Sequence, residues 1–387
     1  MFIKGIRLHH FLSFGDASEF LPLHDLNIII GPNGSGKSNL IESIDLLRNT
    51  PDQIIKIIRE GGGVGEWLWR GAGGKATASI DFEIENPNSP WNFRHFLSFS
   101  AVNQRFEIVD EKIERIPLLD DRQESLPYYS FNSGRPLLNV KGELRTLQAE
   151  NISIEKSILS QRKDPDQYPE LTSLAENYSR IRLYREWQFG RHMISRMPQK
   201  TDLPNDILEQ DSSNLGLVLN RLRREPAVKH RFLEALQALY EGIEDYDVQI
   251  EGGTVQVFLQ ENGHAIPASR LSDGTLRYLS LLAILCHPSP PPLICIEEPE
   301  LGLHPDILPV LAELLKEAST RCQVIVTTHS DVLVDAMHDQ PESVLVCEKN
   351  ENGTQLRRLC PENLAPWLEK YRLGALWTRG EIGGTRW

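Results

Sequence analysis

Residues Gly31–Ser38 read GPNGSGKS and directly follow the apolar run Leu26–Ile30. Glycines at this spacing allow the backbone to wrap its N–H groups around phosphate oxygens, at positions where a Cβ would obstruct the approach. The lysine adds a positive charge for the β and γ phosphates, and the serine hydroxyl is a ligand for Mg²⁺. A strand followed by such a phosphate-binding loop (P-loop) predicts a site for ATP or GTP. The residues expected to hold the nucleotide are Gly31, Asn33, Gly34, Gly36, Lys37, Ser38 and Asn39.

An amphipathic helix is expected directly after this loop. Leu40, Ile41, Ile44 and Leu47 recur at positions that share one helical face. Asn49–Pro51 end the pattern. The N-terminus of this helix would point the positive end of its dipole at the bound anion.

Three segments further along the chain occur in an informative order. They read LSDGTLR at 271–277, LICIEEPELGLHP at 293–305 and CQVIVTTHS at 322–330. Taken in this order, they resemble the signature loop, the Walker B strand with its D-loop, and the switch histidine of ABC-type ATPases. The resemblance implies that two heads close over two nucleotides, so that the signature loop of one chain completes the ATP site of the other.

The same resemblance assigns roles to individual residues. Ser38 and Glu297 would hold Mg²⁺, Glu298 would polarise the attacking water, and His329 would contact the γ-phosphate. Two carboxylates at the end of an apolar strand also fit the usual ligand crevice of an open α/β sheet. The alternative interpretations are a solvated loop start for the two glutamates and a hydrogen-bonded histidine at a strand end.

The sequence departs from the ABC pattern at several points. Glu297 stands where most ABC proteins have an aspartate, so we expect ATP hydrolysis to be slow. The signature reads LSDGT where LSGGQ is common, although Ser272 and Gly274 keep the hydroxyl and N–H donors for the γ-phosphate. Gln161 is a weak candidate for the Q-loop glutamine, and a solvated helix residue is the favoured interpretation there.

The N-terminal segment indicates which branch of the ABC-type ATPases the chain resembles. Phe11, Ser13 and Phe14 form a Phe-x-Ser-Phe element before the P-loop, as in the RecF, SMC and OLD-like branch. The stretches WLWRGAGGKATASIDFEIE and WLEKYRLGALWTRGEIGG are similar to parts of short, stand-alone bacterial AAA family ATPases of OLD-like type, which lack a Toprim domain. The resemblance covers nearly the whole chain and is weakest between about residues 139 and 245.

This resemblance, with the periodicity of the chain, predicts an α/β fold organised as a two-lobed ABC-type head. We expect residues 1–140 to form the N-terminal half with the P-loop core and an antiparallel β lobe. Residues 141–245 show helical periodicity and would form a helical insertion lobe. Residues 246–387 would supply the signature, Walker B and switch histidine. No heptad pattern runs far enough for an SMC-type coiled-coil arm.

Composition and cysteine spacing argue against a membrane protein, a secreted protein and a cysteine-ligated metal site. The chain has 387 residues, a net charge of −13 and no apolar run of transmembrane length, and it begins without the apolar core of a signal peptide, so we expect a cytoplasmic protein with no membrane contact. Its five cysteines show no metal-ligand spacing and are interpreted as reduced packing residues.

Three functions remain open from the sequence. The first is an ATP-driven switch that forms a homodimer or higher oligomer through an ATP sandwich and controls a partner effector or a DNA-associated process, such as anti-phage defence or DNA repair. The second is a self-contained nuclease of OLD type, which would need a Toprim domain after Ser330. The third is the energy-coupling subunit of a transporter, against which the Phe-x-Ser-Phe start argues.

A basic segment, Arg180–Lys200, is the candidate for DNA contact. It has six basic residues against one acidic residue, with three aromatic residues between them. The overall negative charge argues against a broad DNA coat. The alternative, slightly favoured, is that the aromatic residues pack inside and the arginines form a solvated face.

Overall fold

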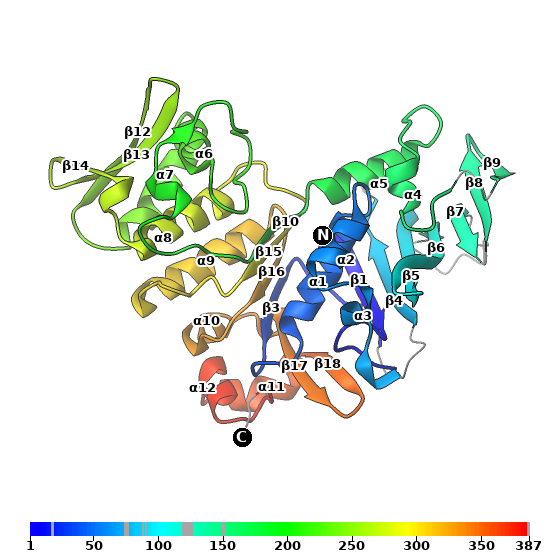
Figure 1. Cartoon of the computed structure of the whole chain (residues 1–387). Helices are drawn as coiled ribbons and strands as arrows, with labels where there is room; N and C mark the ends of the chain where they lie inside the picture. Colours follow the sequence, from blue (N-terminus) through cyan, green and yellow to red (C-terminus); the bar gives the residue numbers. More distant parts are fainter. Residues whose placement is uncertain are drawn as a thin grey trace.

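The computed structural model describes residues 1–16, 19–72, 77–86, 89, 91–117, 127–132, 134–148 and 152–384. A six-stranded sheet in the order β10-β15-β16-β3-β17-β18 lies at the centre of the molecule (Figure 1). Five of these strands are parallel, and β18 runs antiparallel to β17. The strands are β3 (Leu26–Ile30), β10 (Arg182–Tyr184), β15 (Leu293–Glu297), β16 (Gln323–Thr327), β17 (Val344–Asn350) and β18 (Gly353–Arg358).

An antiparallel eight-stranded sheet lies on one side of this centre (Figure 1). Its order is β2-β1-β4-β5-β6-β7-β8-β9, so most neighbours are also neighbours in sequence. The strands are β1 (Ile3–His9), β2 (Leu21–Pro22), β4 (Thr77–Ile84), β5 (Trp91–Val102), β6 (Arg105–Pro117), β7 (Pro127–Asn132), β8 (Arg135–Val140) and β9 (Glu143–Thr146).

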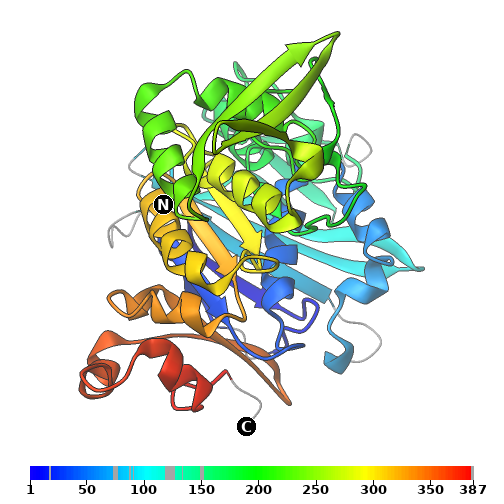
Figure 2. The same cartoon turned by 90° about the vertical axis from the view of Figure 1, so that its left-hand side faces the viewer.

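A smaller lobe lies on the opposite side of the central sheet. It contains β11 (Gln199–Lys200), β12 (Ile243–Glu251), β13 (Thr254–Glu261) and β14 (His264–Pro267), with α6 (Leu215–Leu222), α7 (Pro226–Gln237) and α8 (Asp273–Leu285). Because α8 begins with the LSDGT sequence, this unit is called the signature lobe below. Figure 2 shows it from its own side, with the C-terminal helices at the opposite end of the molecule.

The remaining helices flank the sheets. They are α1 (Lys37–Arg48), α2 (Ile54–Glu60), α3 (Val64–Trp67), α4 (Ile158–Gln161), α5 (Pro169–Ser179), α9 (Leu308–Ser319), α10 (Asp331–Asp335), α11 (Pro361–Leu368) and α12 (Leu373–Thr378). Short 3₁₀ turns occur at Arg70–Ala72, Ile194–Arg196, Ala268–Arg270, Pro305–Ile307 and Pro341–Ser343.

The central sheet separates two hydrophobic cores. Side chains alternate between the faces of a strand, so Ile28 and Val326 pack with the signature lobe and α9, whereas Ile29 and Ile325 pack with α1 and the eight-stranded sheet. The strands are therefore apolar on both faces, as expected for a parallel sheet covered on both sides.

Residues 141–245 do not form a single helical lobe, in contrast to the sequence-based expectation. Helices α4 and α5 pack into the core of the eight-stranded sheet, β10 pairs with β15 in the central sheet, and α6 and α7 belong to the signature lobe. Helical periodicity identifies a buried face but does not identify the core that covers it, which explains the difference. The expected boundary at residue 140 also falls inside a sheet, because β9 follows it.

The predicted α/β head with a P-loop core sheet and an antiparallel β lobe is confirmed. The longest helix in the described residues, α8, has 13 residues, so no long coiled coil is present there. In the same residues, no helix combines the length and the apolar character needed to cross a membrane. The five cysteines are free thiols, and four of them are buried, in agreement with the predicted packing role.

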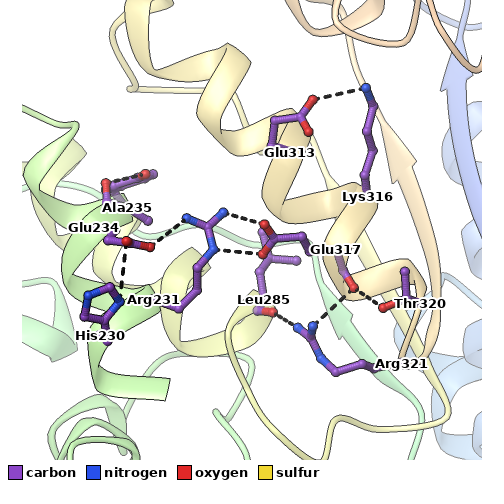
Figure 3. Close-up of polar contacts among 11 residues, drawn as sticks. His230, Arg231, Glu234, Ala235, Leu285, Glu313, Lys316, Glu317, Thr320 and Arg321 are labelled. Atoms are coloured by element: carbon purple, nitrogen blue, oxygen red, sulfur yellow. Dashed lines mark hydrogen bonds and ion pairs between the residues drawn. The ribbon is translucent and has the colours of Figure 1, made fainter. Parts of the chain in front are cut away.

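Polar contacts connect the signature lobe to the central sheet's helices (Figure 3). Arg231 of α7 donates from Nε and Nη2 to the two carboxylate oxygens of Glu317 on α9, at 2.9 and 2.7 Å. Arg321 donates to the carbonyl oxygen of Leu285, at the end of α8, at 2.6 Å. These contacts join helices α7 and α8 of the signature lobe to the helix that leads into β16.

Candidate nucleotide-binding site

Three strand ends bring the candidate residues together. Strands β15, β16 and β3 are parallel neighbours in that order, so their carboxyl ends meet at one edge of the sheet. The P-loop follows β3, Glu297 ends β15, and His329 follows β16. Ligands of open α/β sheets bind at this edge, so one crevice receives the P-loop, Walker B and switch-histidine segments.

The backbone of the P-loop requires glycine at two positions. Gly36 caps the N-terminus of α1 with φ 109°, and Gly34 has φ 79°, both in the left-handed region. A Cβ on Gly36 would lie 2.2 Å from Thr354 Oγ1 and 2.6 Å from Ser13 Oγ. A Cβ on Gly34 would meet nothing within 4 Å, so this part of the loop faces open space.

Lys37 lies inside the loop that would surround the phosphates. Its side chain is buried, and Nζ donates to the carbonyl oxygens of Gly31 at 2.8 Å and Pro32 at 3.1 Å. Burial lowers the pKa of Lys37, and nearby acidic groups, including Glu298, oppose this shift. The cation is thus held at the first turn of α1, where it fits the predicted role of neutralising phosphate charge.

The two residues after Lys37, Ser38 and Asn39, have different roles. Ser38 is exposed in the first turn of α1, as a hydroxyl ligand for Mg²⁺ must be. Asn39 instead donates from Nδ2 to Ser13 Oγ at 2.6 Å. Thr354 Oγ1 lies 2.6 Å from the same Ser13 oxygen and donates to the carbonyl oxygen of Ser35 at 2.7 Å. Asn39 therefore contacts Ser13 of the Phe-x-Ser-Phe element. Through Ser13 and Thr354, this element is connected to the P-loop residue Ser35.

Glu297 is held by an arginine that the sequence reasoning placed elsewhere. Arg185, one residue after β10, donates from Nε to Glu297 Oε1 at 3.2 Å and from Nη2 to Glu42 Oε1 at 2.7 Å. Trp187 Nε1 donates to the Glu297 carbonyl oxygen at 3.0 Å. Burial raises the pKa of Glu297, and the Arg185 charge opposes that shift. The strand that positions Arg185 has only three residues, too few to show a period in the sequence.

Glu298 has a backbone conformation that is uncommon for its residue type. Its φ is 47°, in the left-handed region, which costs energy for a residue other than glycine. Two contacts hold it there: its N–H donates to the Thr327 carbonyl oxygen at 2.9 Å, and its own carbonyl oxygen accepts a hydrogen bond from Arg277. Glu298 Oε1 then lies 3.6 Å from Nε2 of His329. The two candidate catalytic residues, Glu298 and His329, are therefore neighbours.

His329 is oriented by Glu300, which the sequence reasoning did not single out. Glu300 Oε1 accepts hydrogen bonds from the His329 N–H and from Thr328 Oγ1, both at 2.7 Å. Burial, and then the positive charge of Lys37, lower the pKa of His329, while Glu298 and Glu300 oppose the shift. The imidazole is therefore neutral at neutral pH. In the sequence, Glu300 is the third glutamate of EEPE, just after the two predicted site residues, and this position could have identified it.

The signature residues and the P-loop begin helices that pack in different cores, α8 on one side of the central sheet and α1 on the other. Ser272 caps α8 by accepting a hydrogen bond from the Thr275 N–H at 3.0 Å. A Cβ on Gly274 would lie 2.5 Å from the Gly302 carbonyl oxygen, so the loop after Walker B packs directly against the signature. Both Ser272 and Gly274 line a surface pocket of about 410 Å³, together with Gly302 and His304. No P-loop residue lines it in the described part of the chain.

Much of the Arg180–Lys200 segment is engaged inside the molecule. Arg185 contacts Glu297, and Arg196 contacts Asp273 and the carbonyl oxygens of Gly190 and Leu271. The rings of Trp187 and Phe189 lie 4.3 and 5.5 Å from the guanidinium of Arg277, which is buried. The packing interpretation therefore holds for Tyr184, which is buried, and in part for Trp187, which is half-buried, whereas Phe189 is exposed.

The structure separates Gln161 from the expected Q-loop position. Its amide donates to the carbonyl oxygens of Ser153 and Lys156 at 3.1 and 2.7 Å, so it closes a surface loop near α4. Gln188 follows β10, whose carboxyl end adjoins that of the Walker B strand. Together with Arg185, Gln188 lines a polar pocket of about 460 Å³. The other described residues that line this pocket include Asp45 of α1 and Lys56 of α2, and no P-loop residue is among them.

Replacing Arg185 by methionine should weaken Mg²⁺-dependent ATP binding about tenfold or more. Methionine keeps the apolar stem but removes the group that orients Glu297, and partners that orient a metal ligand typically contribute this much. The measurement is the binding of a fluorescent ATP analogue during a Mg²⁺ titration. Arg182→Met, on the strand β10 that precedes Arg185, is the matched control. An unchanged Mg²⁺ dependence in Arg185→Met would contradict the role assigned to Arg185.

Comparisons with known proteins agree with this geometry. Residues 26–335 match the family described as "AAA domain, putative AbiEii toxin, Type IV TA system". The crystal structure of an Smc head bound to the C-winged helix domain of ScpA superposes with a TM-score of 0.55 and 17% identity, covering 95% of this chain and 100% of that one. The Smc head of Pyrococcus furiosus, bound to the C-terminal domain of ScpA, gives 0.54 and 16%, covering 95% and 98%.

Local sequence matches involve the same class of protein. The chromosome partition protein Smc of Synechococcus sp. is 43% identical over 44 residues, which are 11% of this chain and 4% of that protein. The corresponding protein of Clostridium kluyveri is 38% identical over 61 residues, 16% of this chain and 5% of that protein. The chain thus spans a small fraction of the length of these relatives. From the match over residues 26–335, the chain belongs to the AAA-domain family of AbiEii type, and its fold is that of an ABC/SMC-like ATPase head.

Proposed function

We propose that this chain is an ATP-hydrolysing switch that dimerises on ATP and controls a separate effector. The observation that carries the proposal is that α8, which begins in the signature sequence, and α1, which begins in the P-loop, pack in the two cores on opposite sides of the central sheet. A signature sequence across the central sheet from the P-loop helix, in a fold shared with SMC heads, is arranged for use by a second copy. Each of two nucleotides would then contact the P-loop of one chain and the signature loop of the other.

Within each site the residues would act as follows. Lys37 neutralises phosphate charge, and Ser38 and Glu297 hold Mg²⁺, which when bound supplies further compensation of the charge on the phosphates. Glu298 takes a proton from the attacking water. His329, neutral and beside Glu298, hydrogen-bonds the γ-phosphate and changes its contacts when that phosphate leaves. The change in the contacts of His329 would be transmitted between the central sheet and the signature lobe through the helices that connect them.

The effector is proposed to be another protein that acts in a DNA-associated process such as anti-phage defence. The matched family description names a toxin of a type IV toxin–antitoxin system, and the Smc heads named above were solved with a ScpA domain bound. These are properties of the relatives, and they supply the argument for a partner here. A contact with DNA through the exposed part of Arg180–Lys200 belongs to the same proposal.

The dimer is tested by light scattering on the Glu298→Gln variant, which is expected to retain ATP. With ATP and Mg²⁺ the measured mass should rise from that of one chain, 44.0 kDa, to about twice this value, because each nucleotide bridges two chains. Adding Ser272→Ala in the same background should leave ATP binding intact and lower the dimer fraction. If the mass of Glu298→Gln is the same with and without ATP and Mg²⁺, the sandwich mechanism is wrong.

A further inference from the structure

A second group of metal-ligating side chains lies outside the nucleotide site. His9, the last residue of β1, His10 and Asp16 place one ligand atom each within 4.8 Å of the others. Nε2 of His9 is 3.4 Å from Oδ1 of Asp16, and Nε2 of His10 contacts the same oxygen. The cluster combines two imidazoles with one carboxylate, a set of ligands that borderline divalent cations use in proteins.

The backbone places two adjacent histidines on the same side of the chain. Successive side chains of a strand point to opposite faces, but β1 ends at His9, and His10 has φ 50° in the left-handed region. The two rings consequently lie 3.9 Å apart with an interplanar angle of 38°. Continuing the strand through His10 would have separated them.

Other contacts hold His10 in this conformation. Its ring stacks on Trp69 at 5.4 Å with an interplanar angle of 14°, and its carbonyl oxygen accepts a hydrogen bond from the Trp69 N–H at 2.8 Å. Nε2 of His10 is buried, and within the described residues no hydrogen bond of regular geometry satisfies it. Nε2 of His10 faces Oδ1 of Asp16 without such a hydrogen bond, and a cation bound by both groups would satisfy them.

The charge of the cluster also suits a cation. Among the described residues, Asp16 supplies the negative charge of the group, which a divalent cation would balance.

We propose that His9, His10 and Asp16 bind a divalent cation of the zinc class, at a site separate from that of Mg²⁺. The segment between His10 and Asp16 contains Phe11, Ser13 and Phe14, and Ser13 contacts both Asn39 and Thr354 behind the P-loop. A cation would join the two ends of this segment. Its binding should stiffen the support of the P-loop and raise the thermal stability of the chain.

The experiment titrates the full-length, untagged chain, stripped of metal and free of nucleotide, with ZnCl₂ in a calorimeter. All variants carry Cys360→Ser, because Cys360 is the cysteine that is not fully buried. We expect one Zn²⁺ per chain, and about tenfold or greater loss of affinity in His9→Gln and in Asp16→Asn, since each removes one of three ligands. His264→Gln, which removes an exposed histidine of β14, is the matched control and should bind as the parent does.

Cobalt spectroscopy and unfolding curves distinguish ligand loss from misfolding. Co²⁺ should give visible absorption bands in the parent and His264→Gln that are absent in His9→Gln, while the metal-free melting temperatures of all variants remain alike. Absence of stoichiometric binding in the parent would overturn the proposal, and so would binding that persists in both His9→Gln and Asp16→Asn. Either result would mean that the cluster is an ordinary histidine–carboxylate contact.

Discussion

Glu298→Gln should lower the rate of ATP hydrolysis by about 10²- to 10⁴-fold, the usual contribution of a general base. Glutamine has nearly the same shape, and both backbone contacts of residue 298, with Thr327 and with Arg277, are retained because they involve main-chain atoms. The left-handed backbone is therefore still imposed, and only the proton acceptor is lost. ATP affinity should change little, because Glu298 is assigned to the water and not to the phosphates.

The measurement is steady-state phosphate release together with equilibrium ATP binding on the same preparation. Glu313→Gln, on the exposed face of α9, is the matched control for the loss of one negative charge. A variant that keeps more than about one tenth of the parental turnover would show that another group activates the water. Tighter or unchanged binding with lost turnover supports the assigned role.

The sequence predicted the central parts of the site because each is local. A P-loop between a strand and a helix, two glutamates at the end of an apolar strand, and TTHS after another apolar strand are all short patterns with a clear structural context. The parallel sheet then brings β3, β15 and β16 together at their carboxyl ends. The relation between these segments thus follows from the order of strands in the fold.

Contacts between distant segments could not be predicted in the same way. Arg185 reaches Glu297 across 112 positions of sequence, and no periodicity indicates such a pair. His9 and His10 would point to opposite faces in any extended segment, and only the left-handed φ of His10 brings them together. Arg277 was quoted as part of the signature sequence, yet its burial beneath Trp187 depends on the path of the chain after β10.

The distribution of residues 141–245 illustrates the same limit for packing. The apolar stripes of α5 and α7 have similar helical spacing, yet Leu174 of α5 lies in the core of the eight-stranded sheet and Phe232 of α7 lies in that of the signature lobe. Between them along the chain lies β10, which belongs to the central sheet. An apolar stripe specifies which face of a helix is buried but not which core covers that face. The sequence therefore predicts a single lobe for these helices.

Lys37→Ala should weaken ATP binding about 10- to 150-fold, corresponding to about 1.5–3 kcal/mol for hydrogen bonds to a charged group. His329→Ala should bind ATP nearly as the parent does and hydrolyse it slowly. The difference follows from position: Lys37 is buried within the loop that surrounds the phosphates, whereas His329 is partly exposed beside Glu298. Equilibrium binding and single-turnover hydrolysis, measured on both variants, separate the two effects.

Lys37 also has a structural task, and a second substitution distinguishes the loss of the ammonium group from the loss of side-chain volume. Its ammonium donates to the carbonyl oxygens of Gly31 and Pro32, so alanine removes these two hydrogen bonds together with the positive charge. Lys37→Met fills the same space but also lacks the ammonium group and its two hydrogen bonds, so it should bind ATP as weakly as Lys37→Ala if the ammonium group, and not the side-chain volume, is the cause. Recovery of binding in Lys37→Met would assign the loss to packing of the loop. Equal loss of binding in His329→Ala and Lys37→Ala would instead show that His329 supports the structure of the site and takes no separate part in hydrolysis.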